Sequence, residues 1–302
     1  NPEQDPVFRM SIPSIRETDL SGDFDTSGEA DNTVLPGLQH KYRQTALILS
    51  THRCAMYCRH CFRKRLVGIS DDETADNIEE MAAYVSQHSE IFLNSNQIIR
   101  RYLEAFSSIK HLDLIRFGTR TPVVLPMRIY DDPELLDILA RYTKIKQIYV
   151  VTQFNHSNEL TPQAVKAIRC LMDAGIIVKN QTVLLKGIND DAGSLGTLLK
   201  NLTRYGVIPY YIFQCRPVSG VKSQFQIPLT EGCRIVEEAK NMQNGQGKCI
   251  RYAMSHVTGK IEILGQMPDK NMLFKYHQAK YEKGRGRIFS KELAPGQAWL
   301  QG

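Results

Sequence analysis

Short apolar segments alternate with amphipathic segments along most of the chain, and this alternation constrains the fold more than any other feature of the sequence. The pattern runs from Leu112 to Met242. It is typical of parallel strands joined by right-handed helical crossovers. The expected strands are 112–117, 147–152, 181–185 and 210–214, and the expected helices are 97–107, 133–142, 162–175, 195–205 and 227–242.

Two further elements are expected earlier in the chain. The apolar run at 46–50 has the length of a buried parallel strand. Asp71 or Asp72 can cap a helix that continues to about residue 89. Its apolar face would consist of Ile78, Met81, Ala82 and Val85.

Size and composition predict an ordinary globular protein. The 302 residues can bury a sizeable core in one large or two small domains. No apolar run could cross a bilayer, and the polar first 16 residues lack a signal-peptide core. We therefore expect a cytoplasmic protein. Its net charge of +6 fits anionic ligands without requiring nucleic acid.

We divide the chain into an N-terminal arm (1–40), a barrel (41–264) and a short C-terminal extension (265–302). The segment 19–32 is acidic and rich in Ser and Gly, and we expect an extended arm or loop there. The extension is basic and irregular, and we interpret its charge as a solvated surface rather than an RNA-binding one.

Three cysteines follow the expected strand at 46–50 with the spacing C-x3-C-x2-C: Cys54, Cys58 and Cys61. Three thiolates can hold a [4Fe–4S] cluster and leave one iron without a protein ligand. An open metal position can bind a small molecule. In α/β barrels the loops that follow the carboxyl ends of strands carry the chemistry, so this loop is a candidate cluster site.

The cysteines allow two other interpretations. A zinc site needs four N or S ligands, so Cys58 and Cys61 would need His52 or His60 in place of a second cysteine pair. Disulfides are disfavoured because the chain has seven cysteines, an odd number, and is expected to be cytosolic.

The cysteine spacing resembles the signature of the radical S-adenosylmethionine (SAM) enzymes. In that superfamily the open iron binds the amino and carboxylate groups of SAM. An electron from the cluster then cleaves a C–S bond, and the resulting 5′-deoxyadenosyl radical abstracts hydrogen. More specifically, much of the chain, from about residue 35 to 265, resembles the lysine 2,3-aminomutase family. The segments that carry this resemblance are 51–68, 116–126, 154–156, 180–190 and 209–215.

The resemblance implies an α/β fold, a partial (β/α)6 TIM-like barrel. It also implies pyridoxal phosphate (PLP), which holds the migrating amino group of an amino acid such as lysine or glutamate, or of a lysine in a protein substrate. Cys54, Cys58 and Cys61 would hold the cluster, and His60 would lie near the adenine of SAM. Gln181 falls in the strand that contacts SAM, although a hydrogen bond within the barrel would explain it equally well.

Arg63 falls where the lysine enzyme binds the α-carboxylate of its substrate, a task that suits the planar guanidinium. The alternative is a surface arginine within the basic run at 63–65.

The PLP site departs from the family pattern. Lys260 occupies the place of the imine-forming lysine, but its glycine-rich stretch is reduced to Gly259. Thr45 stands where the family has an arginine nine residues before the first cysteine, which leaves Lys41 and Arg43 for the phosphate. The alternative for Lys260 is a surface lysine in a Gly-Lys turn.

The substrate site also departs from the pattern. Two aspartates receive the side-chain ammonium in the lysine enzyme, and Arg216 and Ala253 stand in their places. An unpaired buried charge costs several kcal/mol. We therefore expect a substrate other than lysine, with an anionic or neutral distal group, as in a glutamate-like acid.

A third departure concerns the glycine-rich SAM motif after the second strand. The expected helix ends near Ser89, and the residues 91–96 lead straight into the next helix. They leave no room for a strand, which usually takes about five residues, and a glycine turn, so the break falls between Glu90 and Phe92. A barrel without that strand would expose unpaired edges, so a short segment absent from the chain explains the break better than a true loss.

These observations favour a radical SAM aminomutase with an external flavodoxin- or ferredoxin-type electron donor, and they leave a homo-oligomer open. One alternative is a PLP-independent radical SAM enzyme that acts on a peptide, a metabolite or RNA. Another is a degenerate, non-enzymatic Fe–S protein.

Overall fold

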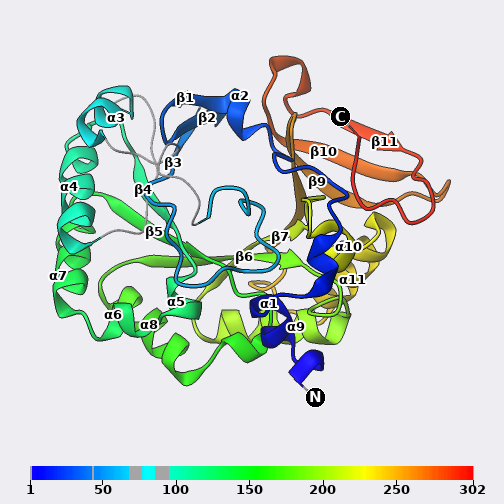
Figure 1. Ribbon diagram of the computed structural model, residues 1–302, viewed down its shortest axis with the longest axis horizontal. Helices are drawn as coiled ribbons and strands as arrows, with labels where there is room; N and C mark the ends of the chain where they lie inside the picture. The colour runs from blue at the N-terminus through cyan, green and yellow to red at the C-terminus, as the bar shows by residue number, and fades with distance from the viewer. Residues whose placement is uncertain (1, 43, 68–76, 86–94, 302) are drawn as a thin grey trace.

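A curled sheet of eight strands forms the centre of the protein (Figure 1). The structure is a computed structural model that describes residues 2–42, 44–67, 77–85 and 95–301. The strand order is β11-β10-β9-β8-β7-β6-β5-β4. The strands are β4 (Leu114–Gly118), β5 (Gln147–Thr152), β6 (Ile177–Leu184), β7 (Ile208–Gln214), β8 (Arg251–His256), β9 (Gly259–Gln266), β10 (Met272–Ala279) and β11 (Ile288–Lys291).

The sheet is parallel in its first part and antiparallel in its second. Each strand from β4 to β8 pairs in parallel with the next, whereas β8 to β11 are joined as antiparallel neighbours. The parallel part confirms an α/β fold with the curvature of a partial barrel.

Helices cover the outer face of this sheet (Figure 1). Their positions agree closely with the predicted ones: α8, for example, begins at Pro162, behind a Thr161 cap that accepts the Ala164 N–H, and Gly175 follows it with φ +83°. The α-helices are α1 (Pro6–Ser11), α2 (Glu29–Asn32), α3 (Ile78–Val85), α4 (Asn96–Ser107), α5 (Thr121–Val124), α6 (Met127–Tyr130), α7 (Pro133–Tyr142), α8 (Pro162–Asp173), α9 (Ala192–Arg204), α10 (Lys222–Phe225) and α11 (Leu229–Asn241).

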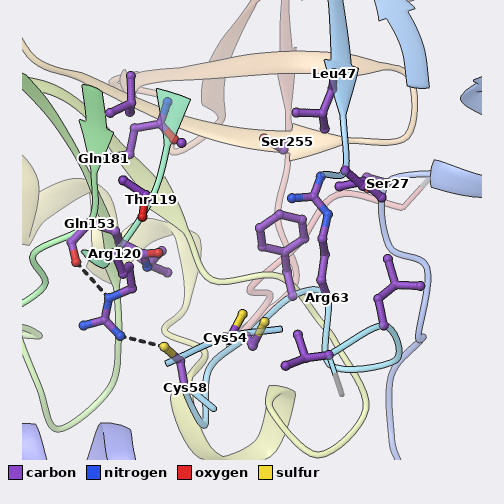
Figure 2. A pocket seen from close by; sticks show the side chains of 18 of the residues that line it. Ser27, Leu47, Cys54, Cys58, Arg63, Thr119, Arg120, Gln153, Gln181 and Ser255 are labelled. Atoms are coloured by element: carbon purple, nitrogen blue, oxygen red, sulfur yellow. Dashed lines mark hydrogen bonds between the residues drawn. The ribbon is translucent and has the colours of Figure 1, made fainter. Parts of the chain in front are cut away.

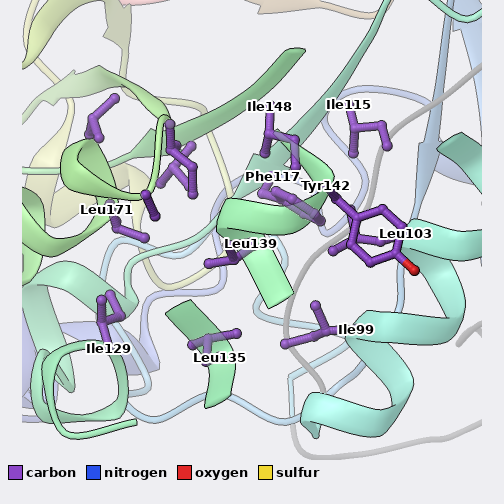
Figure 3. Packing of buried hydrophobic residues seen from close by; sticks show 14 of the residues in the cluster. Ile99, Leu103, Ile115, Phe117, Ile129, Leu135, Leu139, Tyr142, Ile148 and Leu171 are labelled. Atoms are coloured by element: carbon purple, nitrogen blue, oxygen red, sulfur yellow. The ribbon is translucent and has the colours of Figure 1, made fainter. Parts of the chain in front are cut away.

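The largest core cluster joins the first outer helices to the back of β4 and β5 (Figure 3). Leu103 of α4 and Leu139 of α7 are fully buried against Phe117 of β4 and Ile148 of β5. Each such side chain contributes about 1.5–3 kcal/mol by leaving water. This core holds the carboxyl ends of the strands, and the loops that follow them, in fixed positions.

The prediction of a parallel strand at 46–50 is wrong. The residues form β3 (Thr45–Ile48), which pairs antiparallel with β2 (Leu38–Tyr42) in a separate three-stranded sheet completed by β1 (Thr33–Leu35). A short apolar run fits either kind of pairing, because both bury it. The cysteine loop still follows the carboxyl end of this strand, as expected.

Two terminal segments are more ordered than predicted. The arm contains α1, the one-turn helix α2 and the 3-10 turns η1 (Pro2–Gln4) and η2 (Ile15–Thr18). It runs past the loops after β6 and β7, where Arg9 donates to the Gly187 carbonyl at 2.6 Å and Asp23 N–H to the Pro217 carbonyl. The tail is not irregular, since β10 and β11 extend the sheet and η4 (Glu282–Gly284) lies between them.

Two predictions fall outside the described residues: the proposed caps Asp71 and Asp72, and the missing glycine motif between Glu90 and Phe92. Of the predicted helix face, Ile78 and Met81 are buried. No helix in the described part of the chain has the length and apolar character that a membrane span requires.

Candidate active site

One cavity of about 670 Å³ gathers most of the residues that the sequence singled out (Figure 2). Its wall contains the cysteine loop, the carboxyl ends of β4 to β7, the start of β9 and the end of the arm. The volume suits a small-molecule ligand. The position, beyond the carboxyl ends of parallel strands, is where α/β folds bind ligands.

Cys54, Cys58 and Cys61 all line this cavity. Burial raises the pKa of Cys54 and raises that of Cys61 to about 11, so in the absence of iron these two are thiols. Cys58 is turned toward Arg120, whose Nη1 lies 2.6 Å from its Sγ (Figure 2). No three His, Cys, Asp or Glu side chains of the described residues converge on a metal position. The loop thus has the donor chemistry of an iron–sulfur site, with the Cys58 sulfur bonded to Arg120.

His60 is among the residues that line the cavity, although its side chain is largely buried. Its Nε2 lies 3.1 Å from Nδ2 of Asn155 and 3.3 Å from Nε2 of Gln153, and its ring packs edge-on against Phe225. Burial, together with the charge of Arg120, lowers the His60 pKa to about 3. The imidazole is therefore neutral, and its role near adenine stays a prediction.

Gln181 lies on β6, with its side chain in the cavity wall near Thr119 and Gln153 (Figure 2). These polar side chains come from three neighbouring parallel strands or the loops after them, where a nucleoside would find hydrogen-bonding groups. Contact with SAM stays a prediction.

The two predicted PLP lysines have different surroundings. Lys260 lies on β9 in the cavity wall, with its ammonium 4.4 Å from the ring centre of Tyr211. Lys41 donates to the carbonyls of Ser27 (3.1 Å) and His256 (2.7 Å), so two of its three N–H groups are used. Burial, with the charges of Arg216 and Lys280, lowers the Lys41 pKa to about 8. Arg43 lies outside the described residues.

Arg63 and Arg216 flank the ring of Phe62, with guanidinium carbons 4.6 Å and 4.1 Å from its centre. Arg63 is not an isolated surface residue: its Nε and Nη2 each lie 2.9 Å from Oε1 of Glu29. Arg65 approaches the other oxygen of Glu29 at 3.8 Å. We call Arg63, Arg65, Arg216 and Glu29 the Glu29 cluster.

Sequence reasoning missed the acidic partners of these arginines. Glu29 belongs to the arm, 34 positions from Arg63, and Glu159 of the 3-10 turn η3 (Ser157–Glu159) binds Arg120 from 39 positions away. The motif H-x-x-E at 156–159 was the one available signal for Glu159. It forms a capping box, in which the carboxylate accepts the His156 N–H.

A curled sheet that is parallel in its first part, three loop cysteines and a cavity at its mouth are consistent with a radical SAM protein. The comparisons then give the family. A protein of Aquifex aeolicus named "Putative L-lysine 2,3-aminomutase" is 39% identical over 98% of this chain and 82% of its own length. The L-lysine 2,3-aminomutase of Fusobacterium nucleatum is 37% identical over 81% of this chain, and the glutamate 2,3-aminomutase of Clostridioides difficile is 34% identical over 80%. The chain belongs to the lysine 2,3-aminomutase family, whose members are radical SAM isomerases.

The match does not cover every relative fully. The chain spans 59% of the length of the Fusobacterium enzyme and 58% of the Clostridioides enzyme. No protein-family model matches the chain.

Proposed function

We propose that the chain is a radical SAM 2,3-aminomutase for an amino acid whose side chain ends in an anionic or neutral group. Family membership supports the reaction class. It leaves the substrate open, because similar relatives are named for lysine and for glutamate. The substrate class is therefore argued from the cavity of this chain.

Arg216 is the observation that carries the proposal. Its guanidinium lines the cavity, and its Nη1 is buried without a hydrogen-bond partner among the described residues. Burial lowers the pKa of Arg216 to about 10, so the group is still charged at neutral pH. A buried cation with an unused donor suits a carboxylate, and it would repel a substrate ammonium.

The surrounding charges support the same conclusion. Ala253 of β8 is fully buried and contributes no carboxylate. Glu29 is the carboxylate that acts most strongly on Arg216, but it is already bonded to Arg63, and three arginines surround it. The Glu29 cluster therefore carries excess positive charge toward a ligand.

The proposed roles of the other residues are those that the family resemblance implies, and their places in the cavity wall support them. Cys54, Cys58 and Cys61 would hold the cluster, Lys260 would hold PLP, and Arg63 would bind the α-carboxylate after exchanging Glu29 for it. When bound, the cluster and SAM supply radical hydrogen abstraction, and PLP carries the migrating amino group. The arm, packed on the loops after β6 and β7, would shield the cavity from water. An external flavodoxin- or ferredoxin-type donor would supply electrons.

A charge swap tests the substrate class. The reconstituted wild-type protein is expected to isomerise glutamate or a similar acid and to leave lysine unchanged. The variant R216D/A253D should lose about 100-fold in kcat/KM for the acid, because removing one partner of a buried ion pair costs about 2–5 kcal/mol, and should gain turnover of lysine.

The variant R234D, which changes an exposed arginine of α11 that pairs with Glu238, is the matched control and should keep the wild-type preference. Lysine turnover by the wild type, with the acids inert, would rule out this substrate class.

A PLP-independent radical SAM enzyme is the second candidate, and the bonding of Lys41 to two backbone carbonyls favours it. The visible absorbance of protein-bound PLP, abolished by borohydride and absent from Lys260→Ala, would exclude it. A wild-type protein that takes up the cluster but no PLP would establish it.

A further inference from the structure

Arg120 lies between the cysteine loop and the loop after β5, and it is bonded to both. It lies in the loop between β4 and α5, and each of its three guanidinium nitrogens has a different partner; Figure 2 shows two of them, Gln153 and Cys58. Nε donates to the Gln153 carbonyl at 3.0 Å, Nη2 to the carboxylate of Glu159, and Nη1 points to Sγ of Cys58 at 2.6 Å.

Glu159 is itself fixed, so Arg120 has little freedom. The Glu159 side chain is only 3% exposed, and its second carboxylate oxygen accepts the backbone N–H groups of Asn155 (2.6 Å) and His156 (3.1 Å). An arginine side chain stays protonated in proteins, and Arg120 is ion-paired with Glu159. The guanidinium is therefore a permanent, immobile positive charge whose remaining donor faces a cluster cysteine.

We infer that Arg120 is a positioning residue that donates a hydrogen bond to the Cys58 sulfur and raises the reduction potential of the cluster. The inference rests on the proposed function, in which Cys58 ligates iron. Hydrogen bonds to cluster sulfurs and nearby charge set the potential. A reduced cluster carries one more negative charge than an oxidised one, so a fixed cation beside a ligand sulfur stabilises the reduced form.

The alternative is that Arg120 only stabilises the fold, by bonding its own loop after β4 to the cysteine loop and to the loop after β5. The two roles differ in one observable, because a purely structural role affects stability and cluster loading but leaves the potential of a loaded cluster unchanged.

The test is a reductive titration of the reconstituted holoprotein with dithionite and redox mediators, followed by the EPR signal of the reduced cluster. Arg120→Gln should lower the one-electron reduction equilibrium constant about tenfold or more, which corresponds to about 59 mV. Arg120→Lys keeps the charge but not the three-way fork, and should fall between Arg120→Gln and the wild type.

Arg128→Gln is the matched control. It removes a second arginine from the same part of the chain, one that binds Asp132 and Asn96 instead of a cysteine, and it should titrate like the wild type. A wild-type potential in loaded Arg120→Gln would overturn the inference. If Arg120→Gln takes up no cluster, Arg120→Lys decides: a lowered potential supports the inference, and an unchanged one overturns it.

The titration does not require aminomutase turnover, so the inference can fail while the proposed function holds. A wild-type chain that binds no cluster through Cys58 would instead overturn the proposed function.

Discussion

Two carboxylates lie beside the candidate active site, and both bind arginines, but their surroundings differ. Glu159 meets one arginine and two backbone N–H groups, and the side chain of Arg120 is 12% exposed. Glu29 meets Arg63, which is 24% exposed, and Arg65 at 3.8 Å, while Arg216 keeps an unused nitrogen. In the Glu159–Arg120 pair, both carboxylate oxygens and all three guanidinium nitrogens have partners within the protein. The Glu29 cluster has more arginines than carboxylates, and the unpartnered Nη1 of Arg216 can bind a ligand.

The difference shows how one residue type can serve two purposes in one cavity. An arginine with a partner at each of its three nitrogens can position or polarise a neighbour, whereas an arginine with an unpartnered nitrogen can bind an anion. Three changes test this distinction.

The largest expected effect is on the free energy of unfolding, at the Glu159–Arg120 pair. Glu159→Ala should lower the free energy of unfolding by about 3–5 kcal/mol, because it leaves Arg120 as an unpaired buried charge. Glu29→Ala should cost less, about 1–3 kcal/mol, since its ion-pair partners Arg63 and Arg65 are partly hydrated. Urea unfolding measures both. Glu134→Ala, at an exposed pair with Arg100, is the control and should cost less than about 1 kcal/mol. Equal losses at Glu159 and Glu29 would remove the distinction.

A smaller effect is expected on ligand affinity, at the Glu29 cluster. Glu29→Gln should lower KM for the proposed acidic substrate about tenfold, or about 1.4 kcal/mol, because Arg63 no longer has to give up a carboxylate. Asp31→Asn, which neutralises an exposed acid of the same helix, should leave KM unchanged. A rise in KM for Glu29→Gln would show that Glu29 helps the ligand bind instead of competing with it.

A pH dependence of stability is also expected from Lys41, beside the Glu29 cluster. Its pKa is lowered to about 8 by burial, so between about pH 8 and 10.5 the unfolded chain holds a proton that the folded chain has lost. Stability should therefore rise with pH across this window in the wild type relative to Lys41→Met. Urea unfolding of both proteins at several pH values measures the difference, and a difference independent of pH would contradict the assigned pKa.

Local signals predicted the outer shell of the fold well. The bounds of β5 agree with the predicted strand at 147–152, because that apolar run is bracketed by polar residues. The start of α8 followed from Thr161 and Pro162, and its end from Gly175. Caps and periodicity act within one element, so they can be read from neighbouring residues.

Pairing between distant segments could not be predicted. The strand β3 has an apolar pattern that suits either a parallel or an antiparallel neighbour, and β2 takes it. In the tail, alternation was present in β10, where Met272 and Phe274 are buried, but the basic residues that follow suggested an irregular surface. Glu29 and Glu159 reach their arginines only through the tertiary fold.

The candidate site shows the same division. The three cysteines were recognisable by spacing, and Arg63, Arg216 and Lys260 do line one cavity. The bonds of Arg120 to Cys58 and of Lys41 to backbone carbonyls carry no sequence signature, because they depend on loops that meet only in the folded chain.

The central claim is that Cys54, Cys58 and Cys61 together hold a cluster with one iron open to SAM. The most direct measurement is anaerobic reconstitution of the whole chain, followed by iron and sulfide analysis and a SAM-cleavage assay with reductant. The account predicts a four-iron cluster that SAM perturbs spectroscopically, with release of 5′-deoxyadenosine, both lost when any one of the three cysteines becomes alanine. A protein that instead binds a single zinc ion through four of its own ligands, and leaves SAM intact, would contradict it.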